Sequence, residues 1–128
     1  EPDIDVEQLE LRRTLRLSTS SELLMRLHWI AILWGRVEGD LALTGGVHTA
    51  VDAIKATMVG ASAVQLVSCL LAHGPERLGA MRDEIATWLE KNEYLSLDQA
   101  RGSMSLLRCP DPHALERANY ARILQTWR

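Results

Sequence analysis

Residues 41–76 read LALTGGVHTAVDAIKATMVGASAVQLVSCLLAHGPE, and this stretch decides the fold class. Two short apolar runs, at 41–43 and 63–67, have the composition of buried strands. Between them Thr49 stands three residues before Asp52, which is the spacing of a helix N-cap, and a glycine follows the helical stretch as a stop. A strand, a Gly-rich loop, a helix and a second strand form a βαβ unit, so we predict an α/β fold with parallel strands.

Helices are predicted on either side of this unit. Thr19 and Glu22 have the spacing of a capping box, and an apolar stripe after them predicts a helix over residues 20–37. Downstream, Gly74-Pro75 marks the start of a helix that runs to Lys91. The inner face of that helix is predicted to carry Leu78, Met81, Ile85, Trp88 and Leu89.

The two ends of the chain have weaker patterns. Residues 1–18 are predicted to be extended or a hairpin, with strand periodicity at 15–17. Ser96 and Gln99 predict the start of a short helix. A last helix is predicted from Asp111, with an apolar stripe of Leu115, Tyr120, Ile123, Leu124 and Trp127.

The composition argues against several classes of protein. The chain has 128 residues, of which 47% are hydrophobic and 24% charged, as in an ordinary globular domain. Its net charge of −3 argues against nucleic-acid partners and against anionic membranes. No apolar run reaches the ~18 residues of a membrane span, and no signal peptide is visible. Two cysteines do not make a disulfide framework, so we expect a reduced, cytoplasmic protein.

The strongest local signal for a ligand lies where the two strands end. Gly45 and Gly46 follow the first strand, after Thr44, and Val67 and Ser68 close the second. Glycine permits the backbone angles that turn several N–H groups toward one point, and the N-terminus of the following helix adds a partial positive charge. The pattern indicates a phosphate site, with a tight turn that binds nothing as the alternative.

Two parallel strands do not make a sheet that stands alone. Parallel sheets are buried on both faces, and a complete (βα)8 barrel takes ~250 residues. The chain therefore either pairs its strands with those of a second copy or supplies only part of a barrel. We divide it into an extended segment (1–18), a region of βα units (19–91) and a C-terminal helical extension (92–128).

An ordered set of motifs over nearly the whole chain resembles the dihydroorotate dehydrogenase family, and especially its bacterial dihydroorotate dehydrogenase-like members. In that family an apolar strand ends in Gly-Gly and Ile or Val, and an Asp, a Gly-Ala pair, a Val-Gln strand and a Gly-Pro follow. Here these positions are Gly45, Gly46, Val47, Asp52, Gly60, Ala61, Val64, Gln65, Gly74 and Pro75. The segments 2–5, 94–97, 101–102 and 109–112 also resemble parts of the family's sequence.

The resemblance implies the C-terminal portion of an FMN-binding TIM barrel, a partial (βα)8 barrel with its last two βα units and extra C-terminal helices. By position, the backbone amides of Gly45, Gly46, Val67 and Ser68 would hold the FMN phosphate, and Thr44 would lie beside the flavin. The family often has Gly-Thr where this chain has Val67-Ser68, and the branched Val67 narrows the site. The strands that carry the family's catalytic base have no counterpart here, so the resemblance implies a flavin oxidoreductase whose C-terminal part does not turn over alone.

Two other interpretations remain open. The chain is a non-catalytic barrel fragment that folds as a homo-oligomer, or it belongs to a phosphate-ligand TIM-barrel enzyme that uses no flavin. Both share the Gly-Gly turn after the first strand. They differ from the flavin interpretation in the ligand they predict: none for the first, and a phosphate ester without preference for flavin for the second.

Other candidate residues are given structural interpretations. The histidines and cysteines show no metal-ligand spacing such as CxxC or HExxH, so the sequence predicts no metal site; the residues are His28, His48, His73, His113, Cys69 and Cys109. Cys69 is predicted to be a small buried hydrophobe, and His28 a structural histidine. The cluster of Arg12, Arg13 and Arg16 is interpreted as a solvated strand face rather than a phosphate contact.

Overall fold

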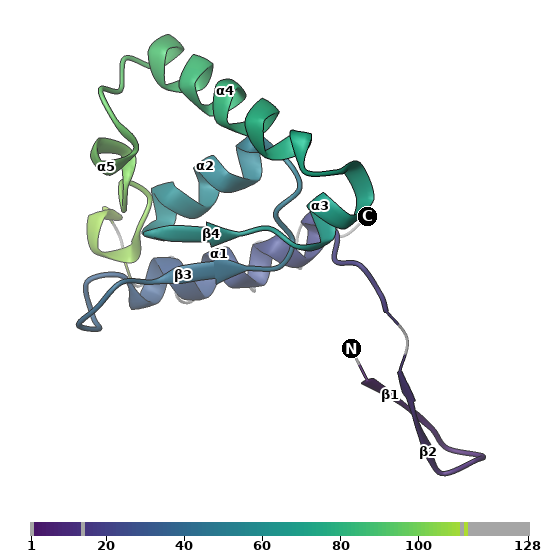
Figure 1. Cartoon of the computed structure of the whole chain (residues 1–128). Helices are drawn as coiled ribbons and strands as arrows, with labels where there is room; N and C mark the ends of the chain where they lie inside the picture. Colours follow the sequence, from purple (N-terminus) through teal and green to yellow (C-terminus); the bar gives the residue numbers. More distant parts are fainter. Residues whose placement is uncertain (1, 14, 111, 113–128) are drawn as a thin grey trace, which may run out of the picture.

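The computed structural model describes residues 2–13, 15–110 and 112, which form a mixed α/β fold (Figure 1). The N-terminal part contains β1 (Pro2–Asp5), β2 (Glu10–Arg13), a 3-10 turn η1 (Ser20–Glu22) and α1 (Leu23–Leu33). The central part contains β3 (Ala42–Thr44), α2 (Ala50–Val59) and β4 (Ala63–Gln65). It is followed by α3 (Ser68–His73), α4 (Glu76–Lys91), α5 (Leu97–Ala100) and a 3-10 turn η2 (Leu106–Arg108).

The predicted βαβ unit is present as β3, α2 and β4. The two strands pair in parallel, with Ala42 opposite Ala63. Thr49 caps α2, because its Oγ1 accepts a hydrogen bond from the N–H of Asp52 at 3.2 Å. The α/β class is therefore confirmed, and the described residues contain this small parallel sheet with flanking helices but form no barrel.

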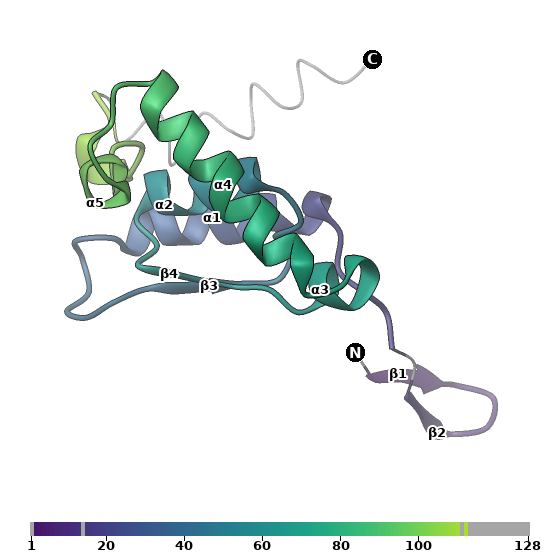
Figure 2. The ribbon, with the colours of Figure 1, turned by 45° about the horizontal axis from the view of Figure 1, so that its top comes forward.

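The helices α1, α2 and α4 gather on one side of the parallel sheet (Figure 2). Leu43 of β3 is 2% exposed and belongs to the core, whereas its neighbours Ala42 and Thr44 are exposed. This alternation follows from the strand geometry, in which successive side chains point to opposite faces. Within the described chain the face of Ala42 and Thr44 is therefore open. The core residues are Leu23, Ile30, Leu43, Val47, Ala53, Ala56, Ala61, Cys69 and Met81.

The sequence predicts that the first helix ends at residue 37, but α1 ends at Leu33. Trp34 leaves the helix with ψ of 124°, and its ring packs closely against two glycines. A Cβ atom on Gly60 would lie 2.3 Å from this ring, and one on Gly102 would lie 2.5 Å from it. The guanidinium of Arg108 also lies over the ring, 5.5 Å from its centroid. These contacts with distant residues stabilise Trp34 outside the helix.

The hairpin predicted within residues 1–18 is confirmed, but the strand predicted at 15–17 is wrong. The strands of this region lie further upstream, where β1 and β2 pair in an antiparallel hairpin with Ile4 opposite Leu11. Residues 15–17 instead connect the hairpin to Ser18, whose N–H donates to the Oγ of Ser68 at 3.0 Å. Residues 15–17 therefore form no strand despite their alternating pattern, because no strand of the described residues pairs with them.

Helix α4 follows the prediction in its bounds but not in its whole inner face. Met81 is 2% exposed, whereas Leu78 is 53% exposed. Leu78, Ile85 and Val64 help to line an apolar cavity of about 500 Å³, which lies between α4 and the β3–α2–β4 unit. Leu78 was predicted to be buried, and it instead borders this space.

The C-terminal part is described in part. Ser96 caps α5 as predicted, since its Oγ accepts from the N–H of Gln99 at 3.3 Å. The helix predicted from Asp111, with its apolar stripe, lies outside the described residues apart from Pro112. Among the helices that the structure describes, none has the length and apolar character needed to cross a lipid bilayer.

Candidate functional site

All five residues predicted to bind a ligand line one pocket of about 530 Å³ at the carboxyl ends of β3 and β4. They are Thr44, Gly45, Gly46, Val67 and Ser68. The parallel pairing brings them together, because the carboxyl ends of parallel strands meet at one edge of the sheet. The segment that leads into α1 completes the walls, with further lining residues Arg16, Ser18, Thr19, Ser21, Glu22, Arg26, Val47 and Gln65.

The Gly-Gly turn requires glycine for two reasons. Gly45 and Gly46 have φ of +85° and +82°, which side chains rarely adopt. A Cβ atom on Gly45 would lie 2.9 Å from the Nε of Arg26, and one on Gly46 would lie 2.7 Å from the backbone nitrogen of Leu23. The turn therefore packs closely against the first turn of α1, and it brings Arg26 to the pocket.

Ser18 connects the two loops that form the pocket. Its Oγ accepts a hydrogen bond from the N–H of Gly46 at 3.1 Å, and its own N–H donates to the Oγ of Ser68 at 3.0 Å. The Gly46 amide, which is predicted to contact a ligand, thus binds Ser18 in this structure, as does the hydroxyl of Ser68. A phosphate that used the Gly46 amide would have to displace the Ser18 hydroxyl.

The N-terminus of α2, which the sequence predicts to attract the phosphate, already holds a carboxylate of this chain. The Oδ2 of Asp52 accepts from the N–H groups of His48 and Thr49 at 3.0 Å each, and from the hydroxyl of Ser20 at 2.8 Å. Burial raises the pKa of Asp52, but the hydrogen bonds from His48, Ser20 and Thr49 outweigh burial, so the pKa lies below its usual value. The charge of a ligand therefore has to be balanced by other groups.

Two arginines supply positive charge to the pocket. Arg26 projects from α1, where its Nη1 donates to the carbonyl oxygen of Glu22 and its Nη2 lies 3.9 Å from the Glu22 carboxylate. Arg16 also lines the pocket, so its interpretation as part of a solvated strand face does not describe it fully. That interpretation suits Arg12, whose exposed guanidinium pairs with Asp5. Sequence reasoning missed Arg26 because a Glu and an Arg four residues apart on a helix are typical of a surface ion pair.

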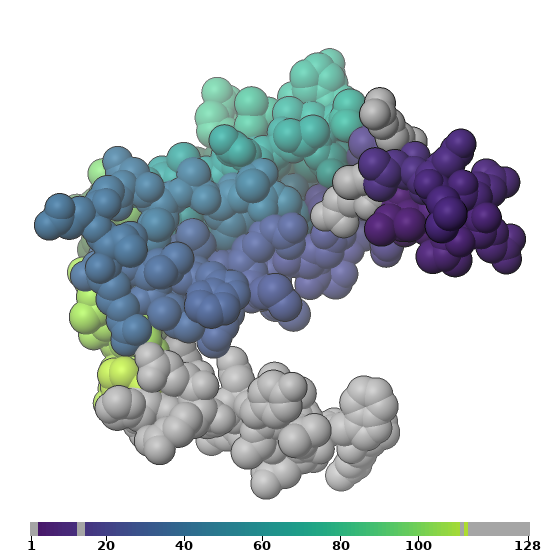
Figure 3. Space-filling view, turned by 90° about the horizontal axis from the view of Figure 1, so that it is seen from below, coloured from purple at the N-terminus to yellow at the C-terminus, as the bar shows by residue number. Residues whose placement is uncertain are grey.

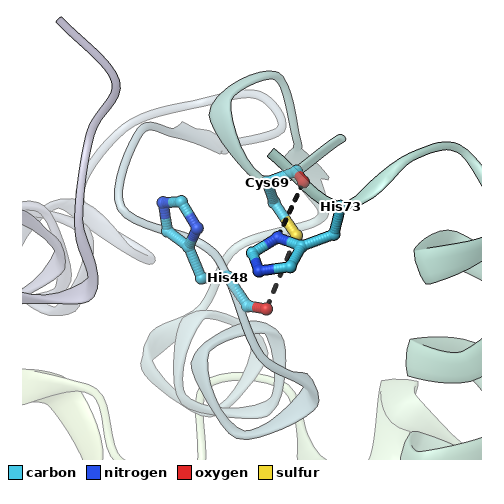
Figure 4. A group of neighbouring side chains, drawn as sticks. All are labelled: His48, Cys69 and His73. Carbon is cyan, nitrogen blue, oxygen red and sulfur yellow. Dashed lines mark hydrogen bonds between the residues drawn. The ribbon is translucent and has the colours of Figure 1, made fainter. Parts of the chain in front are cut away.

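A second group of reactive side chains comes from the loop before α2 and from α3 (Figure 4). His48 precedes α2, while Cys69 and His73 belong to α3. One ring nitrogen of each histidine and the sulfur of Cys69 all lie within 4.8 Å of one another. Cys69 is fully buried, as predicted. Sequence reasoning missed the cluster because its members come from two segments; only the spacing of Cys69 and His73, one helical turn apart, pointed to it.

The sequence matches no protein-family model, and a search of curated proteins finds no match to it. The likeness to dihydroorotate dehydrogenases therefore remains a resemblance of motifs. Function has to be inferred from the pocket and from the residues that line it.

Proposed function

We propose that the pocket at the carboxyl ends of β3 and β4 binds the phosphate of FMN, as the C-terminal part of a dihydroorotate dehydrogenase-like flavin oxidoreductase. The observation that carries the proposal is the convergence of five residues from two separate loops on one pocket. They are the residues to which the resemblance assigns the phosphate: Thr44, Gly45, Gly46, Val67 and Ser68.

The lining of the pocket favours a phosphate monoester over a neutral ligand. Arg16 and Arg26 carry positive charge, and several hydroxyl groups surround them. Hydrogen bonds from arginine to phosphate are charge-assisted and therefore strong. Among the lining residues that the structure describes, Glu22 is the acidic one, and its carboxylate accepts from the N–H of Thr19 at 3.1 Å. This contact is part of the capping box of η1, so the Glu22 carboxylate already has a partner within the chain.

The open face of the sheet supports a partial barrel. In a TIM barrel each strand presents one set of side chains to the surrounding helices and the other to the barrel interior. Leu43 and its neighbours on the same face contact the helices, whereas Thr44 and Gln65, opposite each other in register, lie on the open face and line the pocket. Further strands, supplied by the rest of a barrel or by a second copy, would cover this face.

The residues fit the phosphate end of FMN but include no assigned catalytic group. FMN supplies hydride transfer when it is bound. In this chain, Gly45 and the arginines would hold and orient the phosphate, and Thr44 would lie at the strand end nearest the flavin. No residue of the described chain is assigned as the base that acts on substrate. We therefore expect binding of FMN by this chain without turnover.

The test is a titration of the purified chain with FMN, followed by flavin fluorescence, with riboflavin and inorganic phosphate as competitors. Arg26→Gln should weaken FMN binding by about 10-fold or more, because it removes a charge-assisted hydrogen bond to phosphate. Arg82→Gln is the matched control, since Arg82 is exposed on α4 and pairs with Asp83. Equal binding of riboflavin and FMN would exclude a phosphate site.

Two further outcomes decide between the alternatives. Binding of simple phosphate esters as tightly as FMN would favour a barrel enzyme that uses no flavin. No binding, together with a defined homo-oligomer in analytical ultracentrifugation, would favour a non-catalytic fragment. Gly46→Asp should also abolish phosphate binding through its bulk and negative charge. However, its Cβ would lie 2.7 Å from the backbone nitrogen of Leu23, so the Arg26 variant is the sharper test.

A further inference from the structure

His48, Cys69 and His73 bring three metal-binding atoms together beside the pocket (Figure 4). A ring nitrogen of each histidine and the sulfur of Cys69 lie within 4.8 Å of one another. In a tetrahedral zinc site, bonds of about 2.0–2.3 Å place the ligand atoms roughly 3.3–3.8 Å apart. Side-chain rotations that move these atoms by about 1 Å would therefore bring them to the distances of a zinc site. We infer that these three residues bind one Zn²⁺ ion, with water as the fourth ligand. This inference does not depend on the proposed function.

His48 turns its Nδ1 toward Cys69 and His73, so Nδ1 is the ring nitrogen that it offers to an ion (Figure 4). Its Nε2 is buried and has no hydrogen-bond partner among the described residues. This nitrogen points away from Cys69 and His73, so its missing partner is separate from the cluster, and the proposal rests on the approach of Nδ1 to the other two ligand atoms. The backbone of His48 is held in place, because its N–H donates to Asp52 at 3.0 Å and its carbonyl oxygen accepts from the thiol of Cys69 at 3.5 Å.

His73 is held as zinc-binding histidines commonly are. It lies one helical turn after Cys69 in α3, so both side chains project from the same side of the helix. The Nδ1 of His73 lies 3.1 Å from the carbonyl oxygen of Cys69. In the tautomer that donates this hydrogen bond, Nε2 carries the lone pair that binds a metal. Because His73 is exposed, an ion can reach the cluster from solvent.

Cys69 completes a donor set suited to zinc. Two imidazole nitrogens and a thiolate favour zinc over magnesium or calcium, which prefer oxygen ligands. The thiol releases its proton to solvent as the sulfur–zinc bond forms, so no oxidant or reductant is involved. Arg77 is a neighbouring cation, and its pKa is raised mainly by its hydrogen bond with Glu84 and also by Cys69. The Glu84 carboxylate, 2.7 Å from the Arg77 guanidinium, offsets the positive charge near the zinc site.

The experiment is a titration of the full chain with Co²⁺, followed by displacement with Zn²⁺. Absorption of Co²⁺ reports tetrahedral geometry and bonding to a thiolate. We expect one ion per chain, a thiolate-to-cobalt band, and loss of that band when Zn²⁺ is added. His48→Gln, Cys69→Ser and His73→Gln should each weaken binding by about 100-fold or more, since even outer-shell changes cost about 10–100-fold. His28→Gln, which changes a histidine of α1 outside the cluster, should leave binding unchanged.

The inference is overturned if Co²⁺ does not bind saturably, or if the three variants bind as the unmodified chain does. It is also overturned if His28→Gln weakens binding as much as they do. Because Cys69 is buried, circular dichroism has to show that each variant folds, and the exposed His73 provides the variant least able to disturb the core. A chain that binds zinc but not FMN would retain this inference and refute the proposed function, so the two failures are distinguishable.

Discussion

The β3–α2–β4 unit and the N-terminal hairpin both contain short strands, but burial stabilises only the first. In the unit, Leu43 is 2% exposed and Ala56 is 0% exposed. In the hairpin, the cross-strand pair Ile4 and Leu11 is 66% exposed at both positions. Figure 1 shows the hairpin extending away from the helices and the parallel sheet, and Figure 3 shows its atoms, in purple, at one end of the face in view.

The hairpin depends on local interactions instead. The carboxylate of Asp5 accepts from the N–H groups of Glu7 and Gln8 at 3.0 and 3.1 Å, and it also pairs with Arg12. A two-stranded hairpin without a buried face is marginally stable in water. Strands of similar length therefore differ widely in stability. We expect the hairpin to open without unfolding the rest of the molecule.

The largest expected effect on the free energy of unfolding comes from truncating Leu43 of the unit, with truncation of Leu11 of the hairpin as the comparison. Leu43→Ala should lower the free energy of unfolding by about 2–5 kcal/mol, because it leaves a cavity in the core. Leu11→Ala should change it by no more than about 0.5 kcal/mol, because the side chain is exposed in the folded state. Urea unfolding followed by far-UV circular dichroism measures both. Equal losses in the free energy of unfolding would show that the hairpin unfolds cooperatively with the core.

Two glycines outside the hairpin, Gly60 and Gly39, separate the effect of backbone strain from that of close packing. Gly60 and Gly39 have φ of +122° and +121°, so alanine is strained to a similar degree at both. A Cβ on Gly60 would lie 2.3 Å from the ring of Trp34, whereas one on Gly39 would meet no atom within 4 Å. Gly39→Ala should cost about 1 kcal/mol through strain, and Gly60→Ala about 2–4 kcal/mol because Trp34 must also move. Thermal unfolding followed by tryptophan fluorescence tests the order, and a Gly39 variant as unstable as the Gly60 variant would refute the packing argument.

The same contrast explains how much of the fold could be predicted from the sequence. The start of α2 follows from Thr49 and Asp52, which are three residues apart, and its end follows from Gly60; both signals are local. The end of α1 could not be predicted, because Trp34 leaves the helix to pack against Gly102, far away in the chain. A local pattern is sufficient only where the stabilising contact is local as well.

The candidate site shows the same limit. The convergence of Gly45 and Ser68 could be predicted, because parallel strands bring their carboxyl ends together. The hydrogen bonds of Ser18 to Gly46 and Ser68 could not, because the extended segment before α1 carries no motif that indicates where it docks. The approach of His48 to Cys69 also depends on how the loop before α2 packs against α3, which residue spacing alone does not encode.

The smallest of these effects concerns two carboxylates that accept backbone N–H groups, Asp52 in the unit and Asp5 in the hairpin. Asp52→Asn should lower the free energy of unfolding by about 1–2 kcal/mol at neutral pH, because hydrogen bonds to the charged form are lost. The pKa of Asp52 is lowered in the folded state from its ordinary value of 3.8. Its contribution is therefore fully present above that value, and it is lost as the pH falls through the lower, folded pKa.

The pH dependence separates a global role of the carboxylate from a local one. The unmodified chain should lose stability as the pH falls below about 4, and Asp52→Asn should reduce this loss. Asp5→Asn should leave both the stability at neutral pH and its pH dependence unchanged, since opening of the hairpin is expected to precede global unfolding. Urea unfolding at several values between about pH 2 and 7 measures each variant. If Asp5→Asn reduced the loss of stability at low pH as much as Asp52→Asn does, the hairpin would have to unfold together with the core. The proposed difference in stability between the two regions would then be wrong.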